Sequence, residues 1–333
     1  MKEFNVCPGT LAPGFDKYSS ACIRNMFNGV AVSPILDFNY DADHKDFIVA
    51  VNRISISGVQ EKLSAVIMDK KICLTPADVQ GRYIIKPAPD YKHLRYRNQL
   101  PANEHLTMQI ARQVYKIKTA ENAMIFFKNG DAAYITKRFD YNLDGSKIPQ
   151  EDFASLAGKT EYDYGKDFKY TGSYEDAAAL IRKNVAAWRV EMSHFFKLVV
   201  FNYIFGNGDA HLKNFSLQQT PAGDYLLTPA YDLINTSIHI DDTDFALQEG
   251  LMPRDAHSEI YYNSEHPCKD DFAEFGRRIG VLPKKIANVI ELFATEQQMV
   301  YDLIGHSFLD DRTKRMYKRS YQEHLHRFQR SDK

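Results

Sequence analysis

An apolar helical pattern in this chain runs directly into a polar cluster, which limits the folds open to it. Residues 190–205, VEMSHFFKLVVFNYIF, are predicted to form a buried helix, and GNGDAHLKNFSL follows it. Asp209 and Asn214 lie five residues apart at the exit of this helix. The stretch FFKLVVFNYIF is too short to cross a bilayer and contains Lys197, so we expect it to form core.

The pattern before this helix differs from the pattern after it. Short β-branched and aromatic runs predict strands at 62–69, 71–76, 82–89, 122–130 and 132–140, with hairpin turns at DKK and KNGD. A helix with apolar residues at four-residue spacing is predicted at 101–115, and a short one at 20–29. Later helical patterns cover 174–185, 190–205, 269–281, 283–307 and the tail from Asp310. We therefore expect an α+β fold with a β-rich lobe over residues 1–140 and a helical lobe over residues 141–333.

Composition narrows the class of protein. A chain of 333 residues with 44% hydrophobic residues can bury a sizeable core, and its formal net charge of −1 points to neither nucleic acid nor a membrane. The N-terminal segment has no apolar core typical of a secretory signal. The four cysteines form no C-x-x-C pair, so we expect reduced thiols in a cytoplasmic protein. The basic C-terminal segment is predicted to be a solvated helix face.

Asp209 and Asn214 have the spacing of a known catalytic arrangement. Protein kinases place a catalytic Asp and a metal-binding Asn five residues apart, and a second metal-binding Asp follows. In this chain LLTPAYDL supplies Asp232 after an apolar, β-like run. Carboxylate and amide oxygens are hard ligands that suit Mg²⁺. The spacing therefore predicts a kinase-like phosphoryl-transfer site.

The β-rich region contains candidates for the nucleotide side of such a site. Lys86 ends the predicted strand RYIIKP, where its ammonium is suited to phosphates, and Glu104 near the start of the next helix is a candidate partner. Upstream, SISGVQEK is a polar turn whose backbone N–H groups are able to cradle phosphates.

Each of these residues, taken alone, also has an ordinary structural explanation. Asp209 and Asn214 also fit a helix end with a capped turn, and Asp232 also fits a loop. Lys86 also fits a strand-end surface lysine, and Glu104 an N-terminal helix charge. Their order along the chain favours the kinase interpretation: turn, strand Lys, helix Glu, hairpin, helical lobe, Asp-x4-Asn, strand, Asp.

These motifs together resemble a known family. SISGVQEK, YIIKP, ANEH, KRFD, GNGDAHLKNFS and PAYDL resemble the HipA-type serine/threonine protein kinases of bacterial toxin–antitoxin systems, from about residue 53 onward. The resemblance implies a two-lobed, protein-kinase-like fold. The chain is shorter than full-length HipA, and its SIS serines make it more similar to the short HipT type, in which the N-terminal subdomain is a separate protein.

The resemblance implies a role for each matching residue. Asp209 is expected to be catalytic, Asn214 and Asp232 to hold Mg²⁺, and Glu104 to pair with Lys86. The family usually has an acidic residue where Lys137 stands, so a backbone contact to adenine is expected there. The residues expected around ATP are Ser57, Gly58, Val59, Gln60, Glu61, Lys62, Lys86, Lys137, Arg138, Phe139, His211, Asn214 and Asp232.

The resemblance also implies regulation and partners. The family autophosphorylates a serine of the phosphate-facing loop, and Ser55 and Ser57 match it. Family substrates are aminoacyl-tRNA synthetases, and the usual partners are a DNA-binding antitoxin and, for the short type, the separate subdomain. Two alternatives stay open: a small-molecule phosphotransferase, and an inactive kinase-like regulatory binding module.

Overall fold

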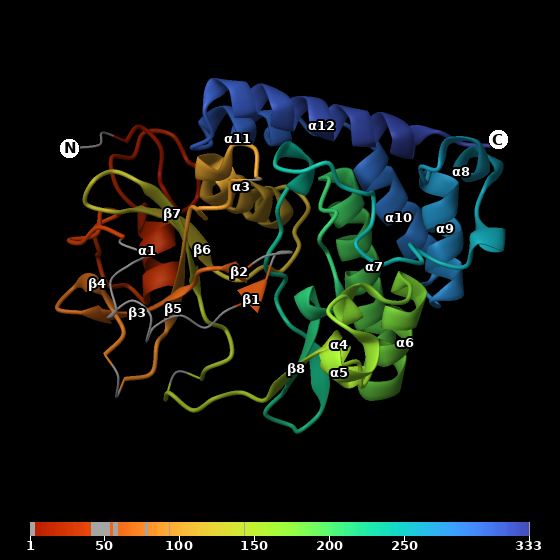
Figure 1. The fold of residues 1–333 in the computed structure, drawn as a ribbon, viewed down its shortest axis with the longest axis horizontal. Coiled ribbons are helices and arrows are strands. Elements are labelled where there is room, and N and C mark those ends of the chain that lie inside the picture. Colours follow the sequence, from red (N-terminus) through yellow and green to blue (C-terminus); the bar gives the residue numbers. More distant parts are fainter. Residues whose placement is uncertain are drawn as a thin grey trace.

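The computed structural model of the chain describes residues 4–40, 54–55, 59–76, 79–92, 94–142 and 144–332. An antiparallel sheet with a covering N-terminal segment lies beside a larger body of helices (Figure 1). The expected α+β, two-lobed organisation is confirmed. Ser57 and Gly58 of the expected phosphate-facing loop lie outside the described residues.

The main sheet contains the five predicted strands, each shorter at one or both ends than the sequence pattern suggested. They are β3 (Leu63–Met68), β4 (Lys71–Leu74), β5 (Tyr83–Pro87), β6 (Asn122–Phe126) and β7 (Ala132–Lys137). Their order is β4-β3-β5-β7-β6, and every neighbouring pair is antiparallel. The β3–β4 hairpin turns through Asp69 and Lys70, both with positive φ, as a two-residue hairpin favours.

The two faces of this sheet pack against different partners. Ile85 and Ile135 share a core with α1 (Ser20–Phe27), whereas Met124 and Tyr134 belong to the larger core that includes α3 (Leu100–Gln113). Side chains alternate between the faces of a strand. Lys86, which pairs with Tyr134 across β5 and β7, therefore points toward the α3 side of the sheet.

Helix α3 lies between the sheet and the helical lobe and is buried along most of its length. Its buried polar side chains bond to distant parts of the chain. Asn103 Nδ2 donates to the carbonyl of Asn235 at 2.8 Å, and the hydroxyls of Thr107 and Tyr317 lie 2.8 Å apart. Because buried polar groups require partners, these contacts fix how the two lobes meet.

The helical lobe is built around the buried helix predicted from the sequence, α7 (Trp188–Ile204). Its other long helices are α6 (Tyr174–Asn184), α9 (Lys269–Arg278), α10 (Pro283–Ala294), α11 (Gln298–His306) and α12 (Asp311–Gln329). The predicted continuous helical stretch 283–307 is wrong, because Thr295 leaves the helical conformation and separates α10 from α11. Helix α12 crosses above both α3 and α7 (Figure 1).

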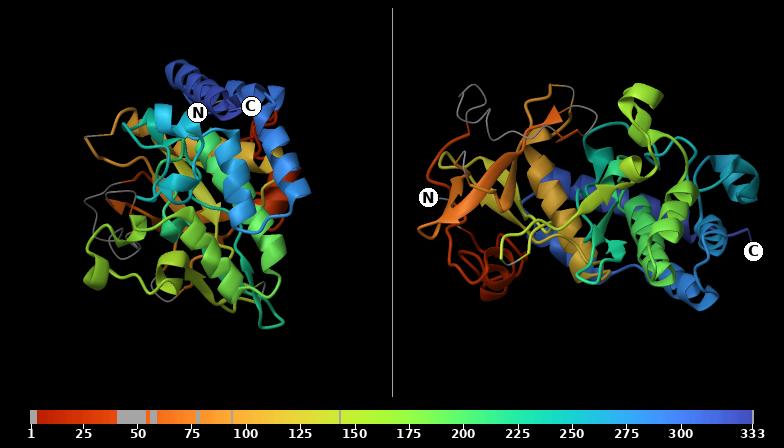
Figure 2. Two further views of the ribbon diagram at one scale, coloured as in Figure 1. Left: turned by 90° about the vertical axis from the view of Figure 1, so that its right-hand side faces the viewer. Right: turned by 90° about the horizontal axis from the view of Figure 1, so that it is seen from below.

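A second sheet was predicted only in part, because the sequence indicated a β-like run before Asp232 and no strand beside it. It consists of β8 (Gln150–Asp152), β9 (Ser216–Gln219) and β10 (Tyr225–Leu227), in the order β10-β9-β8. It leaves the segment between α7 and β9, with Asp209 and Asn214, next to the segment after β10, with Asp232. Figure 2 shows this sheet against the helical lobe.

The remaining elements are short. The strands β1 (Ile54–Ser55) and β2 (Val59–Gln60) pair with each other, and α4 (Phe153–Leu156), α5 (Glu161–Tyr164) and α8 (Glu259–Ser264) are single turns or little more. The 3-10 helices are Arg97–Gln99, Phe168–Tyr170, Leu212–Asn214, Thr236–Ile238 and Arg254–Ala256. Across the described ranges, no helix has the length and apolar character needed to traverse a membrane.

Candidate active site

Three charged side chains from three separate elements meet where the two lobes join. Lys86 Nζ on β5 lies 2.6 Å from Glu104 Oε1 on α3 and 2.5 Å from Asp232 Oδ1 after β10. Lys62 Nζ lies 4.0 Å from the other oxygen, Asp232 Oδ2. Lys86 and Glu104 are almost fully buried, whereas the Asp232 side chain retains 27% exposure. The structure thus brings together four of the residues that the sequence singled out.

Burial and mutual attraction set the charges of this cluster. Burial alone would lower the pKa of Lys86, but Asp232 and Glu104 outweigh it and raise that pKa above its usual value. Burial would raise the pKa of Asp232, but Lys86 and Lys62 hold it well below its usual range. Burial raises the pKa of Glu104, and Lys86 only partly opposes it. Asp232 is therefore firmly ionised.

The backbone at Asp232 adopts a conformation that few non-glycine residues take. Its φ is 55°, in the left-handed region. The neighbouring Tyr231 holds the segment, since its hydroxyl lies 2.6 Å from Ser216 Oγ and donates to the Lys213 carbonyl at 2.9 Å. Such backbone strain persists only where surrounding contacts impose it, and it is concentrated at functional sites.

Asp209 lies in the tight connection that follows α7. Tyr170 OH donates to Asp209 Oδ1 at 2.8 Å, which fixes the carboxylate. Burial raises the pKa of Asp209 to about 7, with the Tyr170 hydrogen bond and Lys169 opposing the shift. A carboxylate with a pKa near neutral pH is suited to accept a proton.

A glycine permits a second carboxylate to approach this connection. A Cβ at Gly208 would lie 2.4 Å from the Asp242 Cγ and 2.5 Å from the Thr243 carbonyl oxygen, so any larger residue would force both the Asp242 side chain and the backbone beside it to shift. Asp242 adds to the electrostatic effects that raise the pKa of Asp209. The absence of a side chain at Gly208 therefore allows Asp242 to lie close to the connection that contains Asp209.

Asp209 and Asn214 are linked through a turn around His211. The N–H of His211 donates to the Asp209 carbonyl at 2.8 Å and to Asn214 Oδ1 at 3.1 Å. Both ring nitrogens of His211 are buried and make no hydrogen bond within the part of the chain that the structure describes. Burial lowers the pKa of His211 to about 3, so its ring is neutral at physiological pH. The turn fixes the Asn214 side chain relative to Asp209.

The oxygens of Asn214 and Asp232 suit a magnesium ion. Asp232 is ionised, and among the described residues the contact of its Oδ2 is with Lys62 Nζ at 4.0 Å. Among the described residues, no three His, Cys, Asp or Glu side chains are grouped as metal ligands. Mg²⁺ commonly uses only one or two protein carboxylates and keeps several waters, so this donor set fits it.

The residues expected beside adenine do not all face the cluster. Lys137 Nζ donates to the Asn25 carbonyl at 3.0 Å and to Asn28 Oδ1 at 2.6 Å, at the end of α1 on the opposite face of the sheet. Arg138 pairs with Asp140. Phe139 packs its ring 5.8 Å from that of Tyr231, the neighbour of Asp232. Of the three side chains, Phe139 is the one beside the cluster.

The expected phosphate-facing segment leads directly into the cluster. Ile54 and Ser55 of β1 pair with Gln60 and Val59 of β2. Glu61 follows and is partly buried, and Lys62 then brings its ammonium to Asp232. A hairpin so close to Lys62 and Lys86 suits a loop that contacts anionic groups.

Sequence reasoning missed two residues beside Asp209. Tyr170 bonds to its carboxylate and packs edge-on against His211, with ring centroids 5.2 Å apart. Lys169 is buried, and Asp209 partly offsets the effect of burial on its pKa. Both belong to a short 3-10 helix about forty residues earlier in the chain, and no motif marks them.

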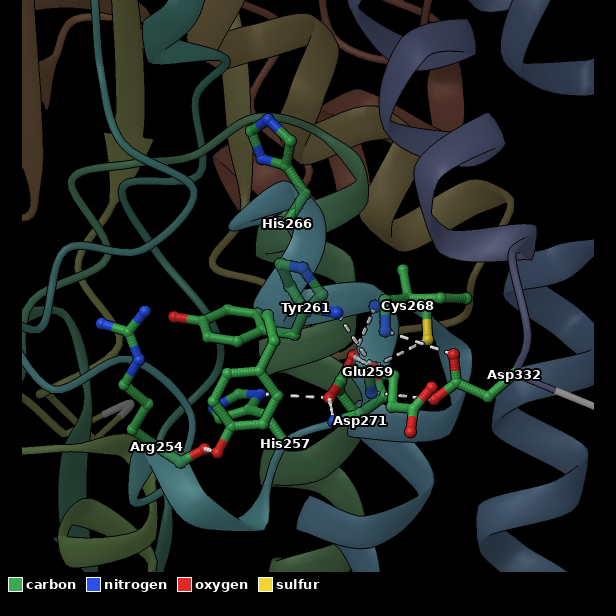
Figure 3. Close-up of polar contacts among 12 residues, drawn as sticks. Arg254, His257, Glu259, Tyr261, His266, Cys268, Asp271 and Asp332 are labelled. Carbon is green, nitrogen blue, oxygen red and sulfur yellow. Dashed lines mark hydrogen bonds and ion pairs between the residues drawn. The ribbon is translucent and has the colours of Figure 1, made fainter.

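A second polar cluster lies away from this site (Figure 3). Asp271 accepts hydrogen bonds from His257 Nδ1 at 3.1 Å and from the Ser258 and Cys268 backbone N–H groups at 2.7 and 2.8 Å. Asp332 accepts bonds from two N–H groups at the start of α8. These carboxylates cap helix ends and hold the C-terminus, which explains the cluster as structural.

Comparison with known proteins identifies the family to which this chain belongs. Residues 54–300 match the model of the HipA-like C-terminal domain. A putative kinase of Haemophilus influenzae is 28% identical over 276 residues, covering 77% of this chain and 76% of the relative. The putative kinase Y4dM of Sinorhizobium fredii is 30% identical and covers 67% and 56%. The serine/threonine-protein kinase toxin HipA of Shewanella oneidensis is 28% identical and covers 57% and 45%. The chain thus spans about half the length of these last two relatives.

Solved structures show the same fold. One chain of the Shewanella oneidensis MR-1 complex of HipA, HipB and operator DNA superposes with a TM-score of 0.63 at 22% identity, covering 87% of this chain and 66% of its own. The Helicobacter pylori proinflammatory kinase CtkA superposes with a TM-score of 0.52 at 12% identity, covering 88% and 94%. The expected two-lobed, kinase-like α+β fold is therefore confirmed.

Proposed function

Because this chain belongs to the family of HipA-like C-terminal domains, we propose that it is a serine/threonine protein kinase that uses ATP and Mg²⁺. The main support for this proposal is that Lys86 Nζ lies between two carboxylates, 2.6 Å from Glu104 Oε1 and 2.5 Å from Asp232 Oδ1. Protein kinases use a strand lysine, a helix glutamate and a metal-binding aspartate in this way. A buried cation that joins three elements is well placed to meet phosphates.

Asp209 is the proposed catalytic residue. Its pKa of about 7 leaves a substantial ionised fraction at neutral pH, so its carboxylate accepts or orients the proton of a substrate hydroxyl. Tyr170 holds Asp209 Oδ1 at 2.8 Å and acts as a positioning residue. The neutral His211 adds no charge beside this carboxylate.

Lysines and backbone groups from the sheet side are proposed to bind ATP. Lys86 and Lys62 supply positive charge for the phosphates, and the segment Ser57 to Glu61 supplies backbone N–H groups. The adenine edge is proposed to meet the backbone at Lys137, Arg138 and Phe139, where β7 ends. The Lys137 side chain takes no part, since it is bound to α1.

Asn214 Oδ1 and Asp232 Oδ2 are proposed to hold Mg²⁺. When bound, the ion neutralises negative charge on the phosphates. Asp232 Oδ1 stays with Lys86, so one carboxylate serves the lysine and the metal through different oxygens.

The kinase is proposed to modify itself on Ser55 or Ser57. Their loop leads into Lys62, next to the cluster. A phosphate there adds about −1.5 to −2 charges and repels ATP or draws the loop toward a cation.

The biological setting is proposed from the family. Relatives include a kinase toxin, and one similar structure is a complex of HipA with HipB and operator DNA. We propose a cytoplasmic toxin of the short HipT type, with lobes at 1–140 and 141–333. An antitoxin with a DNA-binding domain and a separate N-terminal-subdomain protein are the proposed partners, and the proposed substrate is an aminoacyl-tRNA synthetase.

A phosphoproteome tests this function. Cells expressing the wild type and cells expressing Asp209→Asn at equal levels are compared. We expect a small set of phosphoserine or phosphothreonine sites, with a synthetase among them, in the wild type alone. Identical phosphoproteomes, with ATP-dependent phosphorylation of a small molecule by the purified protein, would favour the phosphotransferase instead.

A further inference from the structure

A cavity of about 670 Å³ opens on the helical lobe, and the segment from Asn214 to Ser216 forms part of its lining. Helices α7 and α10, the segment after α3 and the strand β10 form its walls. Its apolar lining includes Leu198, Phe215, Val281, Val289 and Leu292. Sites for small molecules have this size and this mostly apolar character.

The charges around this cavity are almost all positive. Five basic side chains line it: Lys116, Lys118, Arg189, Lys197 and Lys285. The single carboxylate of the lining, Glu191, is already engaged, because its Oε2 accepts bonds from the Leu227 N–H at 3.2 Å and from His194 Nδ1 at 3.5 Å. Lys116 Nζ donates to the Gln113 carbonyl at 2.7 Å and Arg189 stacks over the Trp188 ring, but none of the five cations forms an ion pair with a described carboxylate. The cavity therefore offers an apolar interior and an excess of positive charge.

Lys197 is the cation that lies deepest in this arrangement. It is half-buried on α7, next to the apolar Leu198. Across the described ranges, its ammonium makes no ion pair and no hydrogen bond, and burial lowers its pKa. A half-buried cation without a partner is costly, and an anionic ligand would remove that cost.

We propose that this cavity binds a small molecule with an apolar chain and a single carboxylate, such as a medium- or long-chain fatty acid. The chain would lie against Leu198, Val289 and Leu292, and the carboxylate would pair with Lys197, with Lys285 at the rim. An inorganic anion would leave the apolar lining uncovered, and a neutral hydrocarbon would leave Lys197 unpaired.

The site adjoins the proposed catalytic machinery. Asn214, Phe215 and Ser216 line the inner wall of the cavity, and Asn214 is a proposed metal ligand. A bound ligand would therefore restrain this segment and tune the enzyme. This consequence rests on the proposed function, whereas the binding itself does not require kinase activity.

Calorimetry with decanoate and decanol on the full chain tests the site. We expect decanoate to bind more tightly than decanol, and its affinity to fall as salt is added. Lys197→Met keeps the length and apolar character of the stem. It should therefore lower the affinity for decanoate by about tenfold or more and leave the affinity for decanol unchanged. Lys284→Met is the matched control, because Lys284 is exposed on the same helix as Lys285 but lies outside the cavity.

Two further variants test the same cavity if Lys197→Met fails to fold. Lys285→Met at the exposed rim should weaken decanoate measurably, and Val289→Trp should block both probes by filling the cavity. Absence of decanoate binding to the wild type, or equal binding in Lys197→Met or Lys285→Met and in the Lys284→Met control, would overturn the proposal. Both results are obtained without a kinase assay, so they stand apart from any failure of the proposed function.

Discussion

Lys86 Nζ and Asp232 Oδ1 are 2.5 Å apart, although 146 residues separate them in the sequence. The lysine belongs to the main sheet, and the aspartate follows the second sheet in the helical lobe. Glu104 on α3 completes the arrangement from between the lobes. One cation thus connects all three parts of the fold that the proposed chemistry needs.

Replacing the central cation should destabilise the fold as well as prevent catalysis. Lys86→Met leaves Glu104 and Asp232 without their partner, and breaking a buried ion pair costs about 3–5 kcal/mol. Chemical denaturation should show a lower free energy of unfolding. Lys71→Met is the control, since Lys71 pairs with Asp37 on an exposed surface and its loss should change little. Equal stability of the two variants would contradict the buried cluster.

Asp209→Asn should prevent phosphoryl transfer without destabilising the fold. Loss of proton acceptance typically lowers rates by roughly 10²–10⁴-fold.

Asp209 has a folded pKa of about 7, above the unfolded value of about 3.9. Between these values the folded state binds more protons at Asp209, so the contribution of Asp209 to the free energy of unfolding falls as pH rises to about 7 and is level above it. The variant should therefore melt no lower than the wild type at neutral pH, and a lower melting temperature would argue against this carboxylate being destabilised by burial.

The pH dependence of transfer should identify Tyr170 as a positioning residue. The wild-type rate should rise with pH through an apparent pKa near 7 as Asp209 ionises. The Tyr170 hydrogen bond lowers that pKa, so Tyr170→Phe should move the rising limb of the pH–rate profile to higher pH. A purely structural role for Tyr170 would reduce the rate at every pH and leave the limb in place.

Removal of either proposed metal ligand should abolish the effect of Mg²⁺ on nucleotide binding. Calorimetry with a non-hydrolysable ATP analogue should show tighter binding with Mg²⁺ in the wild type, and little gain in Asn214→Ala or Asp232→Asn. Asp37→Asn, on the exposed surface, is the control. A full magnesium effect in both site variants would place the metal elsewhere.

Phosphate on the SIS loop should lower ATP affinity. Peptide mapping after treatment with ATP is expected to find phosphate on Ser55 or Ser57 in the wild type and none in Asp209→Asn. Ser57→Asp should also bind ATP more weakly than Ser57→Ala, because added negative charge repels phosphates. An active kinase with an unmodified loop would refute the autoregulation and leave the kinase assignment intact.

Local sequence patterns were sufficient for the main sheet and for the long helices. Strands such as β5 and helices such as α7 have strong periodicity, and their turns contain residues suited to them. Of the second sheet, the β-like run before Asp232 anticipated β10, whereas β8 and β9 have only three and four residues, too few for a pattern. The break at Thr295 was missed because the flanking apolar pattern continues across it.

The site was predictable only where a motif marked it. Asp209, Asn214 and Asp232 follow kinase-like spacing, and Lys86 and Glu104 follow kinase-like order. Tyr170 reaches Asp209 through tertiary packing, which leaves no local signal. The Lys137 side chain points toward α1 because it bonds to Asn28 at the end of that helix, more than a hundred residues earlier in the chain.

Intact-mass spectrometry of the purified chain after incubation with ATP and Mg²⁺ shows whether the chain phosphorylates itself. We expect the wild type to gain one or more phosphate groups, Asp209→Asn to gain none, and chelation of Mg²⁺ to prevent the gain. An unchanged wild-type mass, from a protein that is folded and binds ATP, would contradict the claim that this chain is a self-phosphorylating protein kinase.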